Sequence, residues 1–171
     1  MAVWTSYRTA RTCWLREGGE LLDVEGASAD PRRARLIALS RGLCRFEFYA
    51  PPPGMSGRGA LRAARLRAEA FAPFTAADSV LLRAREGVAI WWWDGDRTAA
   101  LLEAVGIAYD PERLVPETLL QAPAEGWRQV RCADGYEAQY WRAGALRAAA
   151  WRRRPFSAEQ WAAFAQTLDA P

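Results

Sequence analysis

Alternating apolar and polar positions in the first third of the chain predict short β-strands. Residues 34–50 read ARLIALSRGLCRFEFYA, and we expect two strands here, joined as a hairpin around Arg41–Gly42. In residues 44–49 the apolar side chains fall on every second position, the period of a strand with one buried face. Two shorter strands are expected in TCWLR and ELLDV, on either side of a turn at Gly18–Gly19.

Apolar residues three and four positions apart then predict an amphipathic helix near residues 59–72. Pro73 limits the end of this helix, because proline cannot continue the hydrogen-bond ladder of a helix. Most of the arginines in the segment fall outside the apolar stripe. That stripe consists of Leu61, Ala64, Ala68 and Phe71.

An apolar strand pair follows this helix. SVLLRAR and VAIWWWD are expected to be strands that meet at a turn formed by Glu86–Gly87. A continuous apolar run is typical of a central strand that is covered on both faces. In such a strand Trp91 and Trp93 point to one face and Trp92 to the other. We interpret the tryptophans as core between sheet and helix layers; a base-stacking platform, or a partner contact at the end of the strand, is the alternative.

The rest of the chain predicts a capped helix, a meander and a final helix. DGDRT supplies an Asp or Thr cap, and the helix that it begins ends at Gly106, before another strand. The order strand, helix, strand predicts a β-α-β unit. WRQVRC, EAQYWR and ALRAAAW are typical of an antiparallel meander with hairpin turns. Ser157 and Gln160 form a capping box that opens the final helix.

Together these elements predict a single α/β domain over residues 1–171, with a mixed sheet, helices on both faces and an antiparallel meander near the C-terminus. The composition is that of a globular protein, with 51% hydrophobic residues, 25% charged residues and a formal net charge of +3. No run of 18 or more apolar residues occurs, so we expect no membrane span in this chain. Cys13, Cys44 and Cys132 are interpreted as small apolar core residues in a reducing compartment.

The sequence offers few groups for catalysis. It contains neither His nor Lys, which excludes a Ser-His-Asp or Cys-His pair, a His-ligated zinc and a lysine Schiff base. Asp94, Asp110 and Glu117 could meet as a nuclease-like metal cluster, and this is the alternative that stays open. We therefore expect no enzyme activity, no cofactor and no bound metal.

The order of the predicted parts resembles that of a known family. A strand pair ending in prolines, RLIALSRGLCRFEFYAPPP, precedes a helix ending in AEAFAPFTAAD and a second strand pair ending in GVAIWWWD. LLEAVGIAYDPERLVPETLLQAP and GWRQVRCADGYEAQYWRAGALRAAAW follow. Over residues 34–155 this arrangement resembles the cytoplasmic domain of the L-component of the type II secretion system. It is also similar to type IV pilus assembly proteins with a PilN-type architecture.

The resemblance implies an actin-like, ribonuclease-H-type fold without catalysis. It implies a scaffold at the cytoplasmic side of the bacterial inner membrane, which serves protein transport through protein–protein interaction. The implied partners are the secretion or pilus assembly ATPase and inner-membrane platform proteins, with a homodimer as an alternative. A transmembrane helix normally follows this domain in the family, so we expect an excised domain or a truncated relative.

The resemblance also locates a partner-binding surface. The family has a helix that ends in Pro-Phe and is followed by an acidic loop near the ATPase contact, and FAPFTAAD stands at that place here. Loops on a rigid scaffold commonly carry recognition. We expect Phe71 to be the buried anchor of this loop; the alternative is that Phe71 and Phe74 both fasten the helix to the sheet. The expected surface consists of Phe74, Asp78, Arg62 and Arg65.

A nucleic-acid-binding domain, rich in Arg and Trp and built on a ribonuclease-H-like sheet, is the alternative function. Such proteins place arginines beside exposed aromatic rings on one surface. YWR at 140–142 and WRRR at 151–154 are the two clusters with that composition. The arginines are otherwise dispersed along the chain, so we expect no nucleic acid partner.

Overall fold

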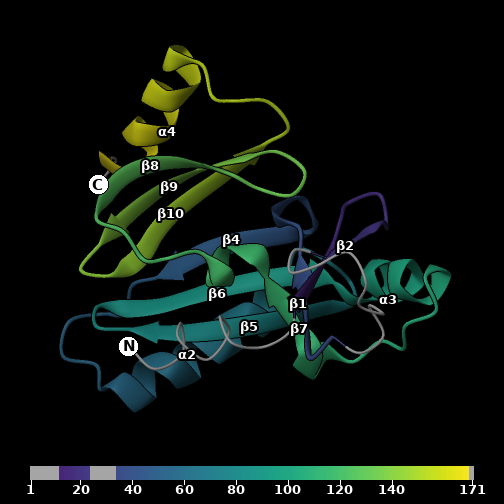
Figure 1. Cartoon of the computed structure of the whole chain (residues 1–171). Coiled ribbons are helices and arrows are strands. Elements are labelled where there is room, and N and C mark those ends of the chain that lie inside the picture. The colour runs from purple at the N-terminus through teal and green to yellow at the C-terminus, as the bar shows by residue number, and fades with distance from the viewer. Residues whose placement is uncertain (1–11, 24–33, 170–171) are drawn as a thin grey trace.

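A small mixed sheet stands at one end of the molecule (Figure 1). The computed structural model describes residues 12–23 and 34–169. The first two strands form the expected hairpin around Gly18–Gly19, and two later strands lie parallel beside it. From edge to edge this sheet consists of β2 (Leu21–Asp23), β1 (Thr12–Leu15), β3 (Leu36–Leu39) and β7 (Leu114–Pro116).

The tryptophan-rich strand is the centre of a second sheet, which is antiparallel throughout. The order of this sheet is β4 (Cys44–Tyr49), β6 (Gly87–Asp94) and β5 (Ala77–Ala84). Ala84 of β5 pairs with Gly87 of β6, which confirms the predicted strand pair. The turn consists of Arg85–Glu86, one residue earlier than predicted. Strand β6 is buried over nearly its whole length, whereas β5 lies at the edge and is partly exposed.

Helix α2 (Gly57–Ala70) covers one face of the second sheet (Figure 1). It begins where the Ser56 hydroxyl accepts a hydrogen bond from the Gly59 backbone N–H at 3.1 Å, as an N-cap serine does. Ala64 and Ala68 are the buried side of the helix and pack against the sheet. The prediction of an amphipathic helix in this segment is confirmed.

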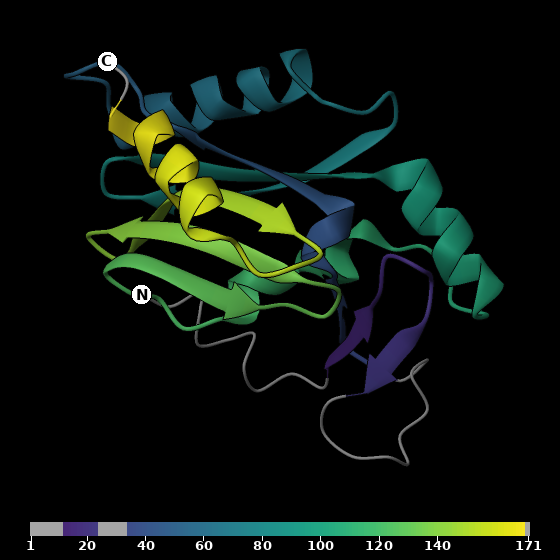
Figure 2. The ribbon, with the colours of Figure 1, turned by 90° about the horizontal axis from the view of Figure 1, so that it is seen from above.

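The C-terminal meander covers the opposite face of the second sheet (Figure 1). Helix α4 (Ala158–Asp169) lies on the outer side of this meander, and the view from above shows it crossing the three strands (Figure 2). The capping box is confirmed, because the backbone N–H and side chain of Ser157 both bond to Gln160 at 3.3 Å. The strands of the meander are β8 (Gly126–Arg131), β9 (Tyr136–Arg142) and β10 (Ala145–Arg152).

Helix α3 (Gly95–Ala104) leaves directly from the end of the tryptophan strand. The Asp94 carboxylate caps it and accepts a hydrogen bond from the Arg97 backbone N–H at 3.0 Å, as DGDRT predicted. Gly106 follows the helix with a positive φ of 73°, the left-handed conformation that commonly ends a helix. Three short 3-10 turns complete the description: η2 (Arg41–Leu43), η3 (Pro111–Arg113) and η4 (Glu117–Leu120).

The three consecutive tryptophans belong to three different hydrophobic clusters. Trp92 lies beneath α2, Trp91 packs against the meander with Trp141, and Trp93 joins the cluster that α3 forms with the mixed sheet through Leu102. All three indoles are buried, with at most 4% of their surface exposed. The interpretation of these tryptophans as core is therefore confirmed, and the base-stacking alternative is excluded for them.

The predicted hairpin at residues 34–50 is wrong. Both strands exist, but β3 pairs in parallel with β1 and β7, whereas β4 pairs with β6 in the other sheet. The link between them is η2 (Arg41–Leu43), whose 3-10 conformation carries the chain forward instead of reversing it. The segment therefore passes from one sheet to the next.

Two further expectations about the layers need correction. The strand after α3 is β7, and it pairs with β3 instead of β6, so no β-α-β unit forms within one sheet. The tryptophan sheet also does not carry helices on both faces, because the meander covers the face opposite α2. A third sheet replaces the second helix layer, and apolar side chains of β9 and β10 such as Trp141 and Leu146 make this possible.

A buried polar network joins the meander to the rest of the protein. Glu137 of β9 is fully buried and forms an ion pair with the Arg41 guanidinium, which also donates to the Cys44 carbonyl at 2.7 Å. Thr118 and Gln139 donate to the same carboxylate at 3.0 and 2.7 Å. A buried charge is costly unless it is paired and hydrogen-bonded. These contacts therefore offset the free-energy cost of burying the Glu137 carboxylate.

Candidate partner-binding site

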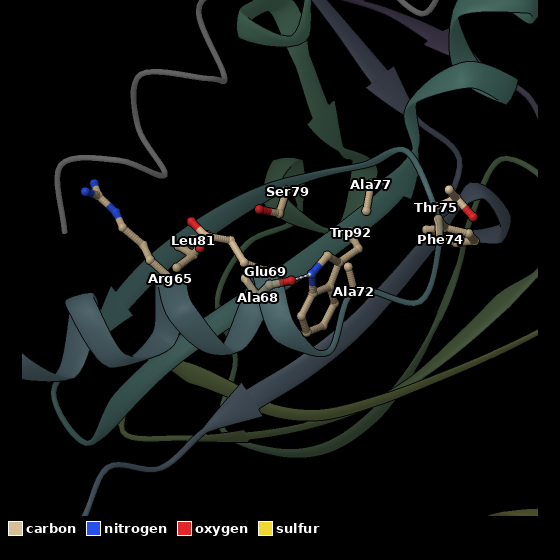
Figure 3. A pocket seen from close by; sticks show the side chains of 10 residues that line it. All are labelled: Arg65, Ala68, Glu69, Ala72, Phe74, Thr75, Ala77, Ser79, Leu81 and Trp92. Carbon is tan, nitrogen blue, oxygen red and sulfur yellow. Dashed lines mark hydrogen bonds between the residues drawn. The ribbon is translucent and has the colours of Figure 1, made fainter.

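A hollow of about 290 Å³ lies between α2 and β5. Trp92 forms part of its wall, and the Trp92 Nε1 atom donates a hydrogen bond to the Ala68 carbonyl at 3.0 Å, which fixes the indole against the helix (Figure 3). Leu81 and Ser79 line the hollow from β5, and Glu69 lines it from α2. The hollow is thus mixed in character, with an aromatic wall and charged side chains at its margin.

The structure brings two of the predicted site residues to this hollow. Phe74 and Arg65 lie at opposite ends of it (Figure 3). Phe74 is half-buried, packs against the cluster that contains Trp92, and has the Arg45 guanidinium 5.9 Å from its ring centre. Arg65 is exposed and forms no ion pair with the described residues. An aromatic ring and an unpaired guanidinium are the kinds of side chain that dominate protein interfaces.

The other two predicted residues do not line this hollow. Asp78 accepts a hydrogen bond from the Tyr109 hydroxyl and lies on the other face of β5. Burial, together with the hydrogen bond to Asp78, raises the pKa of Tyr109 to about 12, so the phenol stays protonated and keeps donating. Arg62 is exposed on α2 outside the hollow. The predicted surface is therefore divided between two faces of the sheet.

The expectation that Phe71 is a buried anchor is wrong. Phe71 is 63% exposed and stands at the C-cap, where the backbone has already left the helical conformation. Its side chain is therefore not part of the buried side of the helix, which contains Ala64 and Ala68. The Arg67 guanidinium lies 4.7 Å from the centre of the Phe71 ring, in cation–π contact.

A second hollow, of about 680 Å³, lies on the opposite face of β5 and was not predicted from the sequence. Leu82 and Ala84 line it from β5, and Trp91 lines it from β6. The turn between β9 and β10 closes the far side with Ala143 and Gly144, together with Leu146 of β10. The Trp91 Nε1 atom is buried without a hydrogen-bond acceptor among the described residues, which costs free energy.

The aromatic and arginine clusters considered for nucleic acid binding do not form a stacking surface. Trp141 of the YWR cluster is fully buried, and the ring of Tyr140 is covered by Trp127 at a centroid distance of 4.6 Å. In the WRRR cluster Trp151 lies close to Gly42, and Arg153 pairs with Glu17 at 3.1 Å. The aromatic rings on which bases would have to stack are therefore packed against other parts of the protein.

The three carboxylates considered for metal binding do not come together. Glu117 is buried and accepts hydrogen bonds from the backbone N–H groups of Arg41 and Ala133. Burial raises the pKa of Glu117 above its ordinary value, although these two donors oppose the shift. Across residues 12–23 and 34–169, no group of three or more side chains of the types that bind metals is arranged to hold an ion.

The cysteines behave as the small apolar residues that the sequence predicted. Cys13, Cys44 and Cys132 are all buried. Burial raises the pKa of the Cys44 thiol to about 12, which leaves it protonated and unreactive at neutral pH. In the described part of the chain no helix has the length and hydropathy that crossing a membrane requires.

Comparison with known proteins gives a partial likeness to a solved structure. No protein-family model matches the sequence, and no curated protein matches it either. Among solved structures the chain is similar to Cyto-EpsL, the cytoplasmic domain of EpsL, an inner membrane component of the type II secretion system of Vibrio cholerae. The identity is 16%, the similarity covers 82% of this chain and 70% of that chain, and the TM-score is 0.48. With an identity and a TM-score this low, the similarity to EpsL assigns no role to the two hollows.

Proposed function

We propose that the chain is a non-catalytic scaffold domain of a bacterial secretion or pilus assembly platform. In this proposal it carries an actin-like subdomain, lies at the cytoplasmic face of the inner membrane, and binds a cytoplasmic assembly ATPase or a sister platform protein. The order of the sequence segments over residues 34–155 supports this proposal. The observation that carries the binding role is the hollow between α2 and β5, with Phe74 and the unpaired Arg65 at its two ends.

The binding role is tested with the purified assembly ATPase encoded in the same genome. Arg65→Glu reverses a charge at the margin of the hollow, and we expect it to weaken binding by at least about tenfold. Arg131→Glu is the matched control, because Arg131 is also exposed but lies on β8 in the meander. Equal binding of both variants to the ATPase, measured by calorimetry, would place the contact elsewhere.

Phe74→Ala separates a binding role from a purely structural one. If the ring is a contact, the variant loses ATPase binding while its Tm falls by less than about 5 °C, which corresponds to roughly 1–2 kcal/mol at this chain length. A larger fall in Tm would assign Phe74 to the core, since the ring also packs against the Trp92 cluster. Calorimetry and a thermal melt of the same sample give both readouts.

The non-catalytic part of the proposal is tested with ATP and Mg²⁺. The chain lacks the lysine and histidine side chains that commonly hold or activate phosphates, and no glycine-rich phosphate-binding motif occurs in it. We expect no heat of binding at micromolar ATP and no release of phosphate. Micromolar affinity that is lost in Asp94→Asn or Asp96→Asn would contradict the proposal.

A further inference from the structure

Strand β5 lies at the edge of its sheet, and its outer side is unpaired among the described residues. The order of the second sheet is β4, β6, β5, and within residues 12–23 and 34–169 no strand pairs with the outer side of β5. Its eight residues are all at least partly exposed. An edge of this kind offers a row of backbone N–H and C=O groups to an incoming strand.

The two hollows flank this edge, one on each face of the sheet. Ser79 and Leu81 of β5 line the hollow on the α2 face, whereas Leu82 and Ala84 line the hollow on the meander face. Successive side chains of a strand point to opposite faces. A strand added beside β5 would therefore direct its side chains alternately into the two hollows, which is the arrangement used when a peptide adds to a sheet edge.

The two hollows differ in the chemistry that they offer. On the α2 face Arg65 and Arg83 are exposed and form no ion pair with the described residues, and Glu69 is the carboxylate among the lining residues. The Arg83 guanidinium lies beside Gly57 at the start of α2, which places the charge on this face. On the meander face the lining is mostly apolar and contains Trp91 and Leu146, with Arg83 and Arg85 at the end of β5 as its charged members.

We propose that β5 accepts an extended segment of a partner protein as an additional strand, with acidic side chains toward Arg65 and Arg83 and apolar side chains toward Trp91. The free edge supplies the backbone hydrogen bonds, and the two hollows select the alternating side chains. The partner is a protein with an exposed strand of alternating acidic and apolar residues. This inference rests on the proposed function, in that it names the kind of segment that the scaffold binds.

The test uses synthetic eight-residue peptides that carry a fluorescent label. The first alternates aspartate and valine, and the second has lysine in place of aspartate. Two further versions of the acidic peptide carry N-methyl groups on every second residue, in one register or the other. Since an added strand uses the amides of one edge, we expect one methylated form to bind at least about tenfold more weakly and the other to bind almost unchanged. The lysine peptide should also bind at least about tenfold more weakly.

Equal binding of the two methylated peptides, or of the lysine and aspartate peptides, would overturn the inference. The double variant Arg65→Glu with Arg83→Glu should lose the acidic peptide, while Arg131→Glu retains it. Hydrogen exchange at the β5 amides should slow when the acidic peptide is bound. If the assembly ATPase binds normally and the acidic peptide neither binds nor competes, the inference fails while the proposed function stands. If the peptide binds as expected but the ATPase does not bind, the platform assignment fails instead.

Discussion

At the scale of single residues, Trp92 fastens a helix to the sheet in two ways. Its ring is buried beneath Ala64 and Ala68, and its Nε1 atom donates to the Ala68 carbonyl at 3.0 Å. That carbonyl lies in the last turn of α2, where backbone acceptors lack a partner within the helix. The indole therefore fills space and satisfies an acceptor at the same time.

Trp92→Ala should lower the free energy of unfolding by about 3–5 kcal/mol, the usual cost of emptying a large buried site. Leu66→Ala is the control on the same helix, because Leu66 is 59% exposed and should cost no more than about 0.5 kcal/mol. Urea titration followed by circular dichroism measures both values. Coincident urea midpoints for Trp92→Ala and the parent protein would contradict the buried position of this side chain.

At the scale of elements, the sequence predicted which segments form strands and helices better than it predicted their pairing. The alternation in residues 44–49 and the apolar run at Trp91–Trp93 are local patterns, and both strands are present. Whether two successive strands form a hairpin depends on the residues between them and on the competing partners. Here the link is a single 3-10 turn at Arg41–Leu43, and β3 and β4 belong to different sheets.

The residues of the candidate site were likewise predicted only in part. The resemblance pointed to Phe74 and Arg65, and both line the hollow between α2 and β5. It also pointed to Asp78, whose neighbours in sequence gave no sign of the hydrogen bond from Tyr109, 31 residues away. The edge of β5 and the hollow beside Trp91 could not be predicted, because they are formed by segments that meet only in the folded chain.

Helix α4 packs against one aromatic residue of the meander. Trp127 of β8 is 39% exposed, and its ring lies 5.4 Å from the ring of Phe164 and 6.1 Å from that of Trp161. A helix of 12 residues is marginal in water without packing of this kind. These contacts, with Phe156 beside them, form a small aromatic cluster separate from the three core clusters.

Trp127→Ala should release α4 while the remainder of the protein stays folded. We expect hydrogen exchange of the α4 amides to accelerate at least about tenfold, and the β6 amides to keep their protection. Tyr140→Phe is a matched control, because it retains the ring that lies 4.6 Å from Trp127 and removes only the hydroxyl. Unchanged exchange in α4 would show that the helix is held by other contacts.

At the scale of the whole molecule, the meander is attached through β9 by charges as well as by apolar contacts. The ion pair of Glu137 with Arg41 connects it to the link between the other two sheets. Arg41→Met should cost about 3–5 kcal/mol, because it leaves a buried carboxylate without its counter-ion. The double variant with Glu137→Met should recover part of this loss, since the uncompensated charge is gone. Urea unfolding of Arg41→Met, Glu137→Met and the double variant measures the three losses. A double loss equal to the sum of the two single losses would indicate that the two groups do not interact.

A second connection, at the turn between β8 and β9, makes the stability of the molecule depend on pH. The Asp134 carboxylate accepts hydrogen bonds from the Arg16 guanidinium and from the Glu17 backbone N–H, both at 2.7 Å. Burial raises the pKa of Asp134, but these hydrogen bonds and the charge of Arg16 lower it more, so the folded pKa lies below the ordinary value. The ionised carboxylate is therefore worth more in the folded state than in the unfolded state.

Because the folded pKa of Asp134 is the lower one, its contribution is fully present above the unfolded pKa, about 3.9, and disappears as the pH falls through the folded value. Asp134→Asn should accordingly be less stable than the parent protein at pH 7, and the difference in urea midpoint should begin to shrink as the pH falls below about 3.9 and go on shrinking as it passes through the folded pKa. Glu103→Gln removes an exposed carboxylate on α3 and is the control for the loss of a surface charge. A gap between Asp134→Asn and the parent that stays constant from pH 7 to pH 3 would mean that the ionised carboxylate does not clamp the meander to the turn between β1 and β2. In that case the Arg41–Glu137 pair and the apolar contacts of Trp91 with Trp141 would carry the attachment alone.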